Sequence, residues 1–241
     1  MAAMILCLDA GNSRLKYGIF DGGGWRKQGA LDYQAFDELV AELPEKPARI
    51  VACNVAGELV RLRVEELANS LDAHLDWLTS SAAACGVTSA YDTPGQLGAD
   101  RWAALIAARA LHAGPAVVVM AGTATTIDAL DGDGMFRGGL ILPGLSLMRA
   151  ALAGNTAGLP HAAGHYRPQP TNTDDAIVSG TIHATLGAIG RLHATLGDDA
   201  LCILSGGAAA ELAPHLDLPL RLIDNLVLEG LARYSKSSST I

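Results

Sequence analysis

One pattern, repeated three times along the chain, most constrains the fold. A short apolar run, expected to form a β-strand, leads directly into a turn that carries glycine with hydroxyl or amide side chains. The runs are 4–8, 116–120 and 201–204, and the polar turns that follow them contain Gly11, Gly122 and Gly206. Glycine lets a ligand approach the backbone closely, and N–H groups in such turns can donate to an anion. One such turn alone is commonly just a tight turn, but three in this order are a more specific sign of phosphate binding.

Strands and helices alternate between these turns. The first half is predicted to contain strands at 4–8, 14–20, near Trp25 and at 49–53, and helices at 34–43, 56–71 and 98–112. Gly114-Pro115 ends the last of these helices. The second half then restarts with strand 116–120, a hairpin across 131–134 and a helix with Thr173 as its N-cap. The sequence therefore predicts an α/β fold in two halves, 1–114 and 115–241.

Composition narrows the class of protein. Half of the 241 residues are hydrophobic, so the chain must bury a core and cannot be a disordered linker. The 17 Lys+Arg against 25 Asp+Glu give a net charge of −8, which argues against nucleic acid or an anionic membrane as a partner. No apolar run approaches the roughly 18 residues of a membrane span, and no signal peptide is expected. Four widely spaced cysteines without a CxxC pair predict buried thiols in a reducing cytoplasm.

The first turn, Asp9-Ala-Gly-Asn-Ser-Arg-Leu-Lys16, has chemistry that suits a phosphate chain. It is not a P-loop, because it lacks GxxxxGK[ST] and leads into a strand instead of a helix. Asn12 and Ser13 can donate hydrogen bonds, Lys16 is a cation, and Asp9 at the strand end can hold a hydrated Mg²⁺. The alternative is a β-hairpin with a polar turn.

A fourth motif lies before the helix at 98–112. Gly98-Ala99-Asp100-Arg101 puts a carboxylate and a guanidinium in the first helical turn. An Asp there can orient a hydroxyl for attack on a phosphoryl group, and Arg101 can hold a carboxylate in two parallel hydrogen bonds. The simpler alternative is an acidic residue favoured by the helix dipole.

Four strings together, DAGNSRLK, GADRW, GTATTID and GGLILPG, resemble the type III pantothenate kinases. These belong to the superfamily of acetate and sugar kinases, heat-shock proteins and actin ATPases. The resemblance covers nearly the whole chain in the expected order. It implies two RNase-H-like (actin-like ATPase) domains, 1–114 and 115–241, with a nucleotide cleft between them. It also implies a cytoplasmic homodimer that uses ATP and Mg²⁺ to phosphorylate pantothenate to 4'-phosphopantothenate, the first step of coenzyme A synthesis.

The resemblance also implies roles for particular residues. Asp100 matches the catalytic base, which takes the proton of the pantothenate hydroxyl. Matches to ATP contacts are Asp9, Ala10, Gly11, Asn12, Ser13, Arg14, Leu15, Lys16 and Thr123. Matches to pantothenate contacts are Tyr91, Gly98, Ala99, Asp100, Arg101 and Thr181.

The chain departs from the family at Met120. Members often carry an Asp two residues before the glycine of GTA, where it helps to bind a monovalent cation such as K⁺ or NH₄⁺. A thioether is a poor ligand for K⁺, so this position argues against a potassium requirement.

Two other functions fit parts of the sequence. A kinase of the same superfamily could act on a sugar, although the chain lacks the extra polar residues that many sugar hydroxyls would need. A non-enzymatic regulator could keep the ATP fold and act through a protein partner. Retention of Asp9, Asp100, Arg101 and Thr123 speaks against the regulator, since a chain without activity tends to lose such residues.

Overall fold

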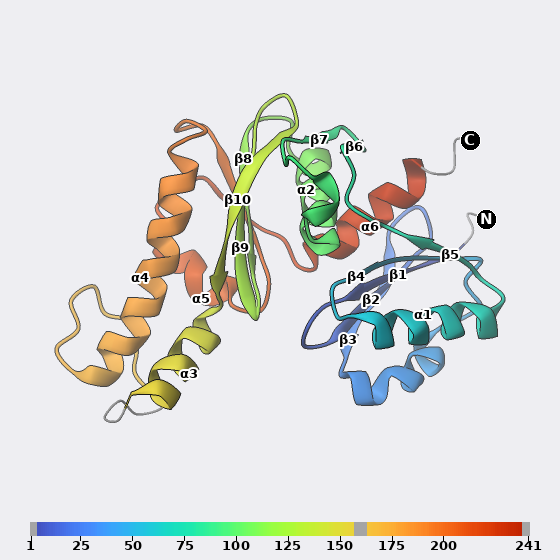
Figure 1. Ribbon diagram of the computed structural model, residues 1–241, viewed down its shortest axis with the longest axis horizontal. Coiled ribbons are helices and arrows are strands. Elements are labelled where there is room, and N and C mark those ends of the chain that lie inside the picture. The colour runs from blue at the N-terminus through green and yellow to red at the C-terminus, as the bar shows by residue number, and fades with distance from the viewer. Residues whose placement is uncertain (1–3, 157–162, 238–241) are drawn as a thin grey trace. The chain divides into compact units, whose positions relative to one another are not determined.

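The computed structural model describes residues 4–156 and 163–237 (Figure 1). The chain divides into two compact units. The first runs through Leu111 and includes the segment from Asn225 onward, and the second is His112–Asp224. The predicted division into 1–114 and 115–241 thus differs at the C-terminus, where the last helix packs with the first unit. That each unit is an RNase-H-like domain stays a prediction.

The first unit is built on a five-stranded sheet in the order β3-β2-β1-β4-β5. Its strands are β1 (Ile5–Ala10), β2 (Leu15–Phe20), β3 (Trp25–Leu31), β4 (Arg49–Asn54) and β5 (His74–Trp77). β1, β2 and β3 pair antiparallel as a meander, which confirms the strands predicted at 4–8, 14–20 and near Trp25, and β4 and β5 continue the sheet in parallel. A short hairpin of β6 (Ala83–Ala84) and β7 (Val87–Ser89) follows.

Helices pack on the sheet of the first unit, whose strands direct alternate side chains to opposite faces. The helices are η1 (Tyr33–Glu42), α1 (Glu58–Leu71), η2 (Pro94–Gln96), α2 (Ala99–Leu111) and α6 (Leu226–Ser237). Leu6 and Leu8 of β1 pack with Phe36 of η1 and Val64 of α1 in one core cluster. α6 contacts β1 and β4, and α2 contacts β4 and α6. Because side chains alternate along a strand, odd-numbered residues of β1, Asp9 included, point to the face opposite Leu6 and Leu8.

The C-terminal helix belongs to the first unit because it packs closely on α2 (Figure 1). A Cβ atom added at Gly230 of α6 would lie 1.9 Å from the carbonyl oxygen of Ala103, so only glycine permits this approach of the two helix backbones. The Trp25 indole also donates to Glu229 at 2.6 Å, and Arg49 donates to the Ser235 carbonyl at 2.9 Å. These contacts tie α6 to β3 and β4.

The second unit contains five strands in the order β12-β11-β8-β9-β10. They are β8 (Ala116–Ala121), β9 (Ala124–Leu130), β10 (Met135–Pro143), β11 (Leu201–Ser205) and β12 (Leu220–Leu222). Its helices are α3 (Leu145–Asn155), α4 (Thr173–His193), α5 (Ala209–Leu212) and η3 (Ala213–His215). The predicted hairpin is confirmed as β9–β10, and its turn is held by Asp131, whose side chain accepts from the N–H groups of Asp133 and Met135. No helix within the described residues is long and apolar enough to span a membrane.

The start of α4 differs by one residue from the prediction. Asn172 is the N-cap, not Thr173, since the Asn172 side chain accepts from the N–H of Asp175 at 2.9 Å. Asn and Thr both cap well, and Asp175 favours Asn172 because its carboxylate accepts from the Asn172 amide at 2.9 Å.

Candidate active site

The first predicted phosphate turn lies between β1 and β2. Asp9, near the end of β1, is opposite Lys16 of β2 and beside Cys53 of β4 in the strand register. Asp9 is only 6% exposed, while Asn12 and Ser13 at the tip of the turn are exposed. A buried carboxylate below an exposed polar turn is the arrangement expected of a ligand site and not of an ordinary surface hairpin.

Burial raises the pKa of Asp9 to about 6. The positive charge of Lys16 opposes this rise, the negative charge of Asp100 adds to it, and a hydrogen bond from Cys53 opposes it. The Cys53 sulfur lies 3.7 Å from Oδ1 of Asp9, and burial raises the pKa of this thiol, so it stays protonated and donates. The effect of Asp100 on Asp9 indicates that the two carboxylates are close enough to interact electrostatically.

Asp100 is presented by the first turn of α2. Its Oδ1 accepts from the N–H of Arg101 at 2.8 Å. A Cβ atom at Gly98 would lie 2.6 Å from this Oδ1, so a side chain there would displace the carboxylate. Arg101 is 5% exposed; its Nη1 lies 3.3 Å from the Tyr91 hydroxyl, and its guanidinium lies 5.9 Å from the ring centre. The structure thus brings together Tyr91, Gly98, Asp100 and Arg101.

Three glycine turns meet in the second unit. The Gly144 N–H donates to the Thr123 carbonyl at 2.9 Å, and a Cβ at Gly144 would lie 2.1 Å from the Gly122 carbonyl oxygen. Gly206 has a φ of +104°, and a Cβ atom added to it would lie 2.4 Å from the Ala121 carbonyl oxygen. The GTATT turn, the PG turn and the SGG turn therefore form one glycine-lined corner, with Thr123 exposed in it.

The other two threonines of GTATT do not lie in the exposed turn. Thr125 and Thr126 lie inside β9 and are buried, as expected if they are there for their β-forming side chains. Of the three threonines, Thr123 is therefore the candidate for phosphate contact.

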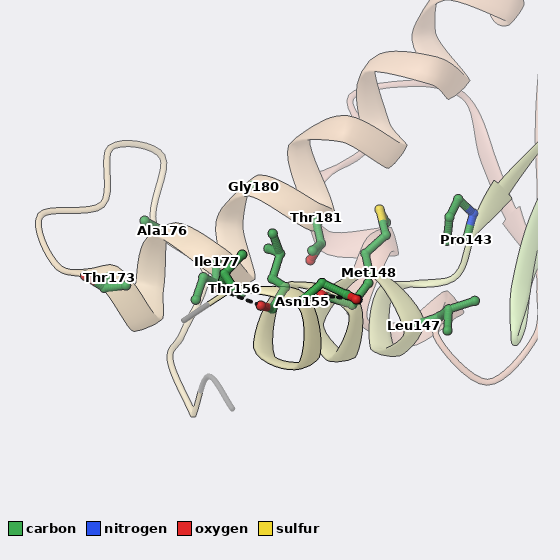
Figure 2. Close-up of a pocket in the computed structure, with 12 residues that line it drawn as sticks. Pro143, Leu147, Met148, Asn155, Thr156, Thr173, Ala176, Ile177, Gly180 and Thr181 are labelled. Atoms are coloured by element: carbon green, nitrogen blue, oxygen red, sulfur yellow. Dashed lines mark hydrogen bonds between the residues drawn. The ribbon is translucent and has the colours of Figure 1, made fainter. Parts of the chain in front are cut away.

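Thr181 lines an apolar pocket of about 780 Å³ in the second unit. Figure 2 shows Thr181 and Ile177 of α4 across from Met148 and Asn155 of α3. The Thr181 hydroxyl donates to the Val178 carbonyl at 2.8 Å and accepts from Nε of Arg149 at 3.3 Å. Its proton is thus already engaged, and a ligand acceptor would have to compete with Val178 for it.

Met120 occupies the position where the family resemblance predicts an Asp. It lies on β8 opposite Thr126 of β9 and next to Ser205 of β11. Asp128 is fully buried and opposite Val118, two residues before Met120 on β8, so its carboxylate does not stand at the position of Met120. Across 4–156 and 163–237, no three His, Cys, Asp or Glu side chains gather as a metal cluster.

Two residues that adjoin the site carry no motif in the sequence. Cys53 faces Asp9 from β4, and the Tyr33 hydroxyl donates to the Gly11 carbonyl. Register explains Cys53: a strand was predicted at 49–53, but not which of its residues would stand beside Asp9. No signal in the sequence marks Tyr33. Among the predicted residues, Asp9, Lys16, Tyr91, Asp100 and Arg101 belong to the first unit, and Thr123 and Thr181 to the second.

Comparisons with known proteins identify the family of the chain. A family model described as type III pantothenate kinase matches residues 5–195. The type III pantothenate kinase of Aromatoleum aromaticum is 49% identical over 234 residues, covering 95% of this chain and 96% of that one. The enzyme of the same name from Dechloromonas aromatica is 48% identical, covering 98% and 100%.

Solved structures show the same fold at lower identity. A Baf family protein from Campylobacter jejuni has a TM-score of 0.69 at 23% identity, covering 98% of this chain and 100% of that one. MreB 5 of Spiroplasma citri, bound to AMPPNP, has a TM-score of 0.52 at 10% identity, covering 99% and 98%. The α/β fold is therefore that of the actin-like ATPases, and the chain belongs to the type III pantothenate kinase family.

Proposed function

We propose that this chain transfers the γ-phosphoryl group of ATP to the primary hydroxyl of pantothenate, giving 4'-phosphopantothenate and ADP, with Asp100 as the catalytic base. The observation that supports this assignment is the electrostatic effect of Asp100 on Asp9: burial is the main cause of the raised pKa of Asp9, and the negative charge of Asp100 adds to it. The candidate base of α2 is thus close enough to interact with the carboxylate below the β1–β2 turn, where we expect the phosphate chain.

Phosphoryl transfer depends mainly on the correct positioning of the hydroxyl and the γ-phosphate. Asp100 orients the hydroxyl and accepts its proton as the new O–P bond forms and the bond from the γ-phosphorus to the bridging oxygen of ADP breaks. The hydrogen bond from the Arg101 N–H keeps the Asp100 carboxylate at the start of α2. Such a base contributes about 10²–10⁴-fold to the rate.

Asp9 fits a role in holding Mg²⁺. Its carboxylate oxygens are the hard ligands that this ion prefers, and Mg²⁺ commonly uses one or two carboxylates together with phosphate oxygens. Asp9 is buried next to a second carboxylate, whose repulsion a cation would relieve. When bound, the ion supplies neutralisation of charge on the phosphates.

The remaining polar groups suit the two substrates. We assign the turn from Ala10 to Leu15, with Lys16, and Thr123 to ATP, since exposed N–H and hydroxyl donors in glycine turns suit phosphate oxygens. Tyr91, Gly98, Ala99, Arg101 and Thr181 are assigned to pantothenate. Arg101 is the natural partner of its carboxylate, because a guanidinium binds carboxylates in a bidentate manner.

Replacement of Asp100 by Asn tests the mechanism. We expect Asp100→Asn to lower kcat about 10²–10⁴-fold in a coupled ADP assay with pantothenate, because the amide cannot accept the proton. Binding of pantothenate and of an ATP analogue should persist by calorimetry. Asp133→Asn, in the exposed β9–β10 turn, is the matched control and should keep wild-type turnover. Wild-type turnover in Asp100→Asn would remove Asp100 from the mechanism.

The proposal also covers the acceptor substrate, the oligomeric state, the cell compartment and the cation requirement. A panel of sugars in the same assay separates this activity from that of a sugar kinase, and growth of cells that lack their own pantothenate kinase separates it from a regulator. We propose a cytoplasmic homodimer that needs no K⁺, since Met120 offers only a thioether. Equal turnover in K⁺, NH₄⁺ and Na⁺ buffers is the expected result.

A further inference from the structure

Tyr33, a residue outside all the sequence motifs, holds the backbone of the β1–β2 turn. We propose that Tyr33 is a positioning residue for the nucleotide: its hydroxyl fixes the Gly11 peptide so that the N–H of Asn12 is directed toward the phosphate chain. The proposal rests on the proposed function, because it takes the β1–β2 turn as an ATP contact.

The contacts span both ends of the turn. The Tyr33 hydroxyl donates to the Gly11 carbonyl and lies 3.4 Å from the Arg14 carbonyl oxygen. Ala10 and Leu15, which flank these residues, are paired in the β1–β2 ladder. The ladder thus fixes the base of the turn, and one side chain from η1 fixes the part that the ladder does not reach.

Tyr33 is itself held in place by its neighbours. Nη1 of Arg63 donates to the Tyr33 carbonyl at 2.6 Å, and Nη2 donates to Asp37 at 3.0 Å. The Arg63 guanidinium also lies 4.4 Å from the ring centre of Phe36, which is buried in the core. The hydroxyl therefore extends from a segment that is anchored to α1 and to the core.

Tyr33 is a hydrogen-bond donor at neutral pH. Burial raises the pKa of its hydroxyl to about 12, and the negative charge of Asp9 adds to the rise. The proton therefore stays on the oxygen, where it is available for the Gly11 carbonyl.

The geometry of the peptide bond links this contact to the ligand. Peptide bonds within the described residues are trans, so the Gly11 carbonyl and the Asn12 N–H point in opposite directions. A carbonyl held toward Tyr33 turns the N–H away from η1. Glycine would otherwise let this peptide rotate, and an anion would have to order it on binding. The hydroxyl removes that cost in advance, which is preorganisation.

Tyr33→Phe is the test, because it removes the hydroxyl and keeps the ring. We expect the Kd for AMPPNP in Mg²⁺ buffer, measured by calorimetry, to rise about fivefold to tenfold, the fold-change that one net hydrogen bond produces. The KM for ATP should rise by the same factor, while the KM for pantothenate stays unchanged. Amide hydrogen exchange over 11–15 should become faster in this variant.

Tyr17→Phe is the matched control. Tyr17 is a buried tyrosine of β2 whose hydroxyl donates to Glu42 at 2.9 Å, and its partners in the ladder are Leu8 and Gly29, which lie outside the turn. It should lose comparable thermal stability and keep wild-type affinity for AMPPNP. Unchanged affinity in Tyr33→Phe, or an equal loss in both variants, would overturn the proposal.

The binding assay needs no acceptor. It therefore separates this role of Tyr33 from the identity of the phosphorylated substrate. A chain that binds AMPPNP through Tyr33 but does not phosphorylate pantothenate would refute the proposed function and leave the positioning role intact. A wild-type chain that does not bind AMPPNP would refute both.

Discussion

At the scale of single residues, the buried carboxylate of Asp9 costs stability. Because its pKa is raised from 3.8 to about 6, the native state binds more protons than the unfolded state between these pH values. Stability must therefore fall as pH rises through this window and then stay reduced above it. The shift corresponds to ~3 kcal/mol at neutral pH.

Asp9→Asn tests whether the stability of the protein falls as pH rises. Without Mg²⁺ or nucleotide, we expect the variant to be more stable than wild type above pH 6 by up to ~3 kcal/mol, with the difference vanishing below about pH 4. Chemical denaturation across pH measures it. Asp131→Asn should behave oppositely: burial of Asp131 is outweighed by hydrogen bonds from Met135 and Arg137 that lower its pKa, so its ionised form stabilises the fold. A pH-independent difference for Asp9→Asn would contradict the argument.

The residues that carry charge or conformational freedom could be predicted from the sequence, and their supporting neighbours could not. Asp9 follows an apolar strand and Asp100 lies in a first helical turn, and both stand within the strings DAGNSRLK and GADRW that carry the family resemblance. Cys53 and Tyr33 are ordinary residues of a strand and a helix. Their places beside Asp9 and Gly11 follow from strand register and from the packing of η1, which depend on the whole unit. The roles of the site residues stay predictions until the variants are measured.

At the scale of elements, α2 depends on a close approach of α6. The carbonyl oxygen of Ala103 fills the space where a Cβ of Gly230 would lie, and the obstacle is backbone on both sides. Since α2 carries Asp100, the separation of these helices would also disturb the site.

Gly230→Ala should therefore destabilise the protein by about 2 kcal/mol or more, because overpacking against backbone cannot be relieved by a rotamer change. Gly187→Ala is the control: Gly187 is an exposed helical glycine of α4 with nothing within 4 Å of an added Cβ, and alanine there should stabilise by about 1 kcal/mol. Urea denaturation measures both. Equal effects would show that helix propensity, not the contact with Ala103, decides the result.

Helices and strands with a hydrophobic periodicity within their own segment were predictable. Elements that form only because a neighbouring strand or side chain pairs with them were not. The meander, α1, α2 and the β9–β10 hairpin follow from alternation, helical spacing and turn residues within their own segments. β5 and β12 are short strands at sheet edges whose pairing depends on β4 and β11. The N-cap of α4 moved to Asn172 because Asp175 completes its hydrogen bonds.

At the scale of the whole molecule, the sequence predicted a restart near Gly114-Pro115 but not the return of the last helix to the first unit. An apolar stripe on α6 would suit either core, and contacts between distant residues, such as Gly230 with Ala103 and Glu229 with Trp25, hold the helix in the first unit. That β1 and α6 lie in one unit is thus a consequence of packing, which local patterns do not encode.

The second unit leaves an apolar surface that we expect a second copy of the chain to cover. Ile141 of β10 is 67% exposed and shares a strand face with Pro143, which lines the pocket of Thr181 together with the exposed Leu147 and Leu152. Monomers seldom leave grouped apolar side chains in water. Sedimentation should therefore give a species of about 50 kDa, twice the 24.9 kDa of the chain.

Ile141→Glu should shift this species toward the monomer, because a carboxylate buried in an apolar interface costs several kcal/mol. It should also raise the KM for pantothenate if the interface completes the pocket. Leu59→Glu is the matched control, since Leu59 of α1 is 80% exposed in the first unit and should leave the dimer intact. A monomeric wild-type protein would exclude this interface. If Leu59→Glu dissociated the dimer and Ile141→Glu did not, the interface would lie elsewhere.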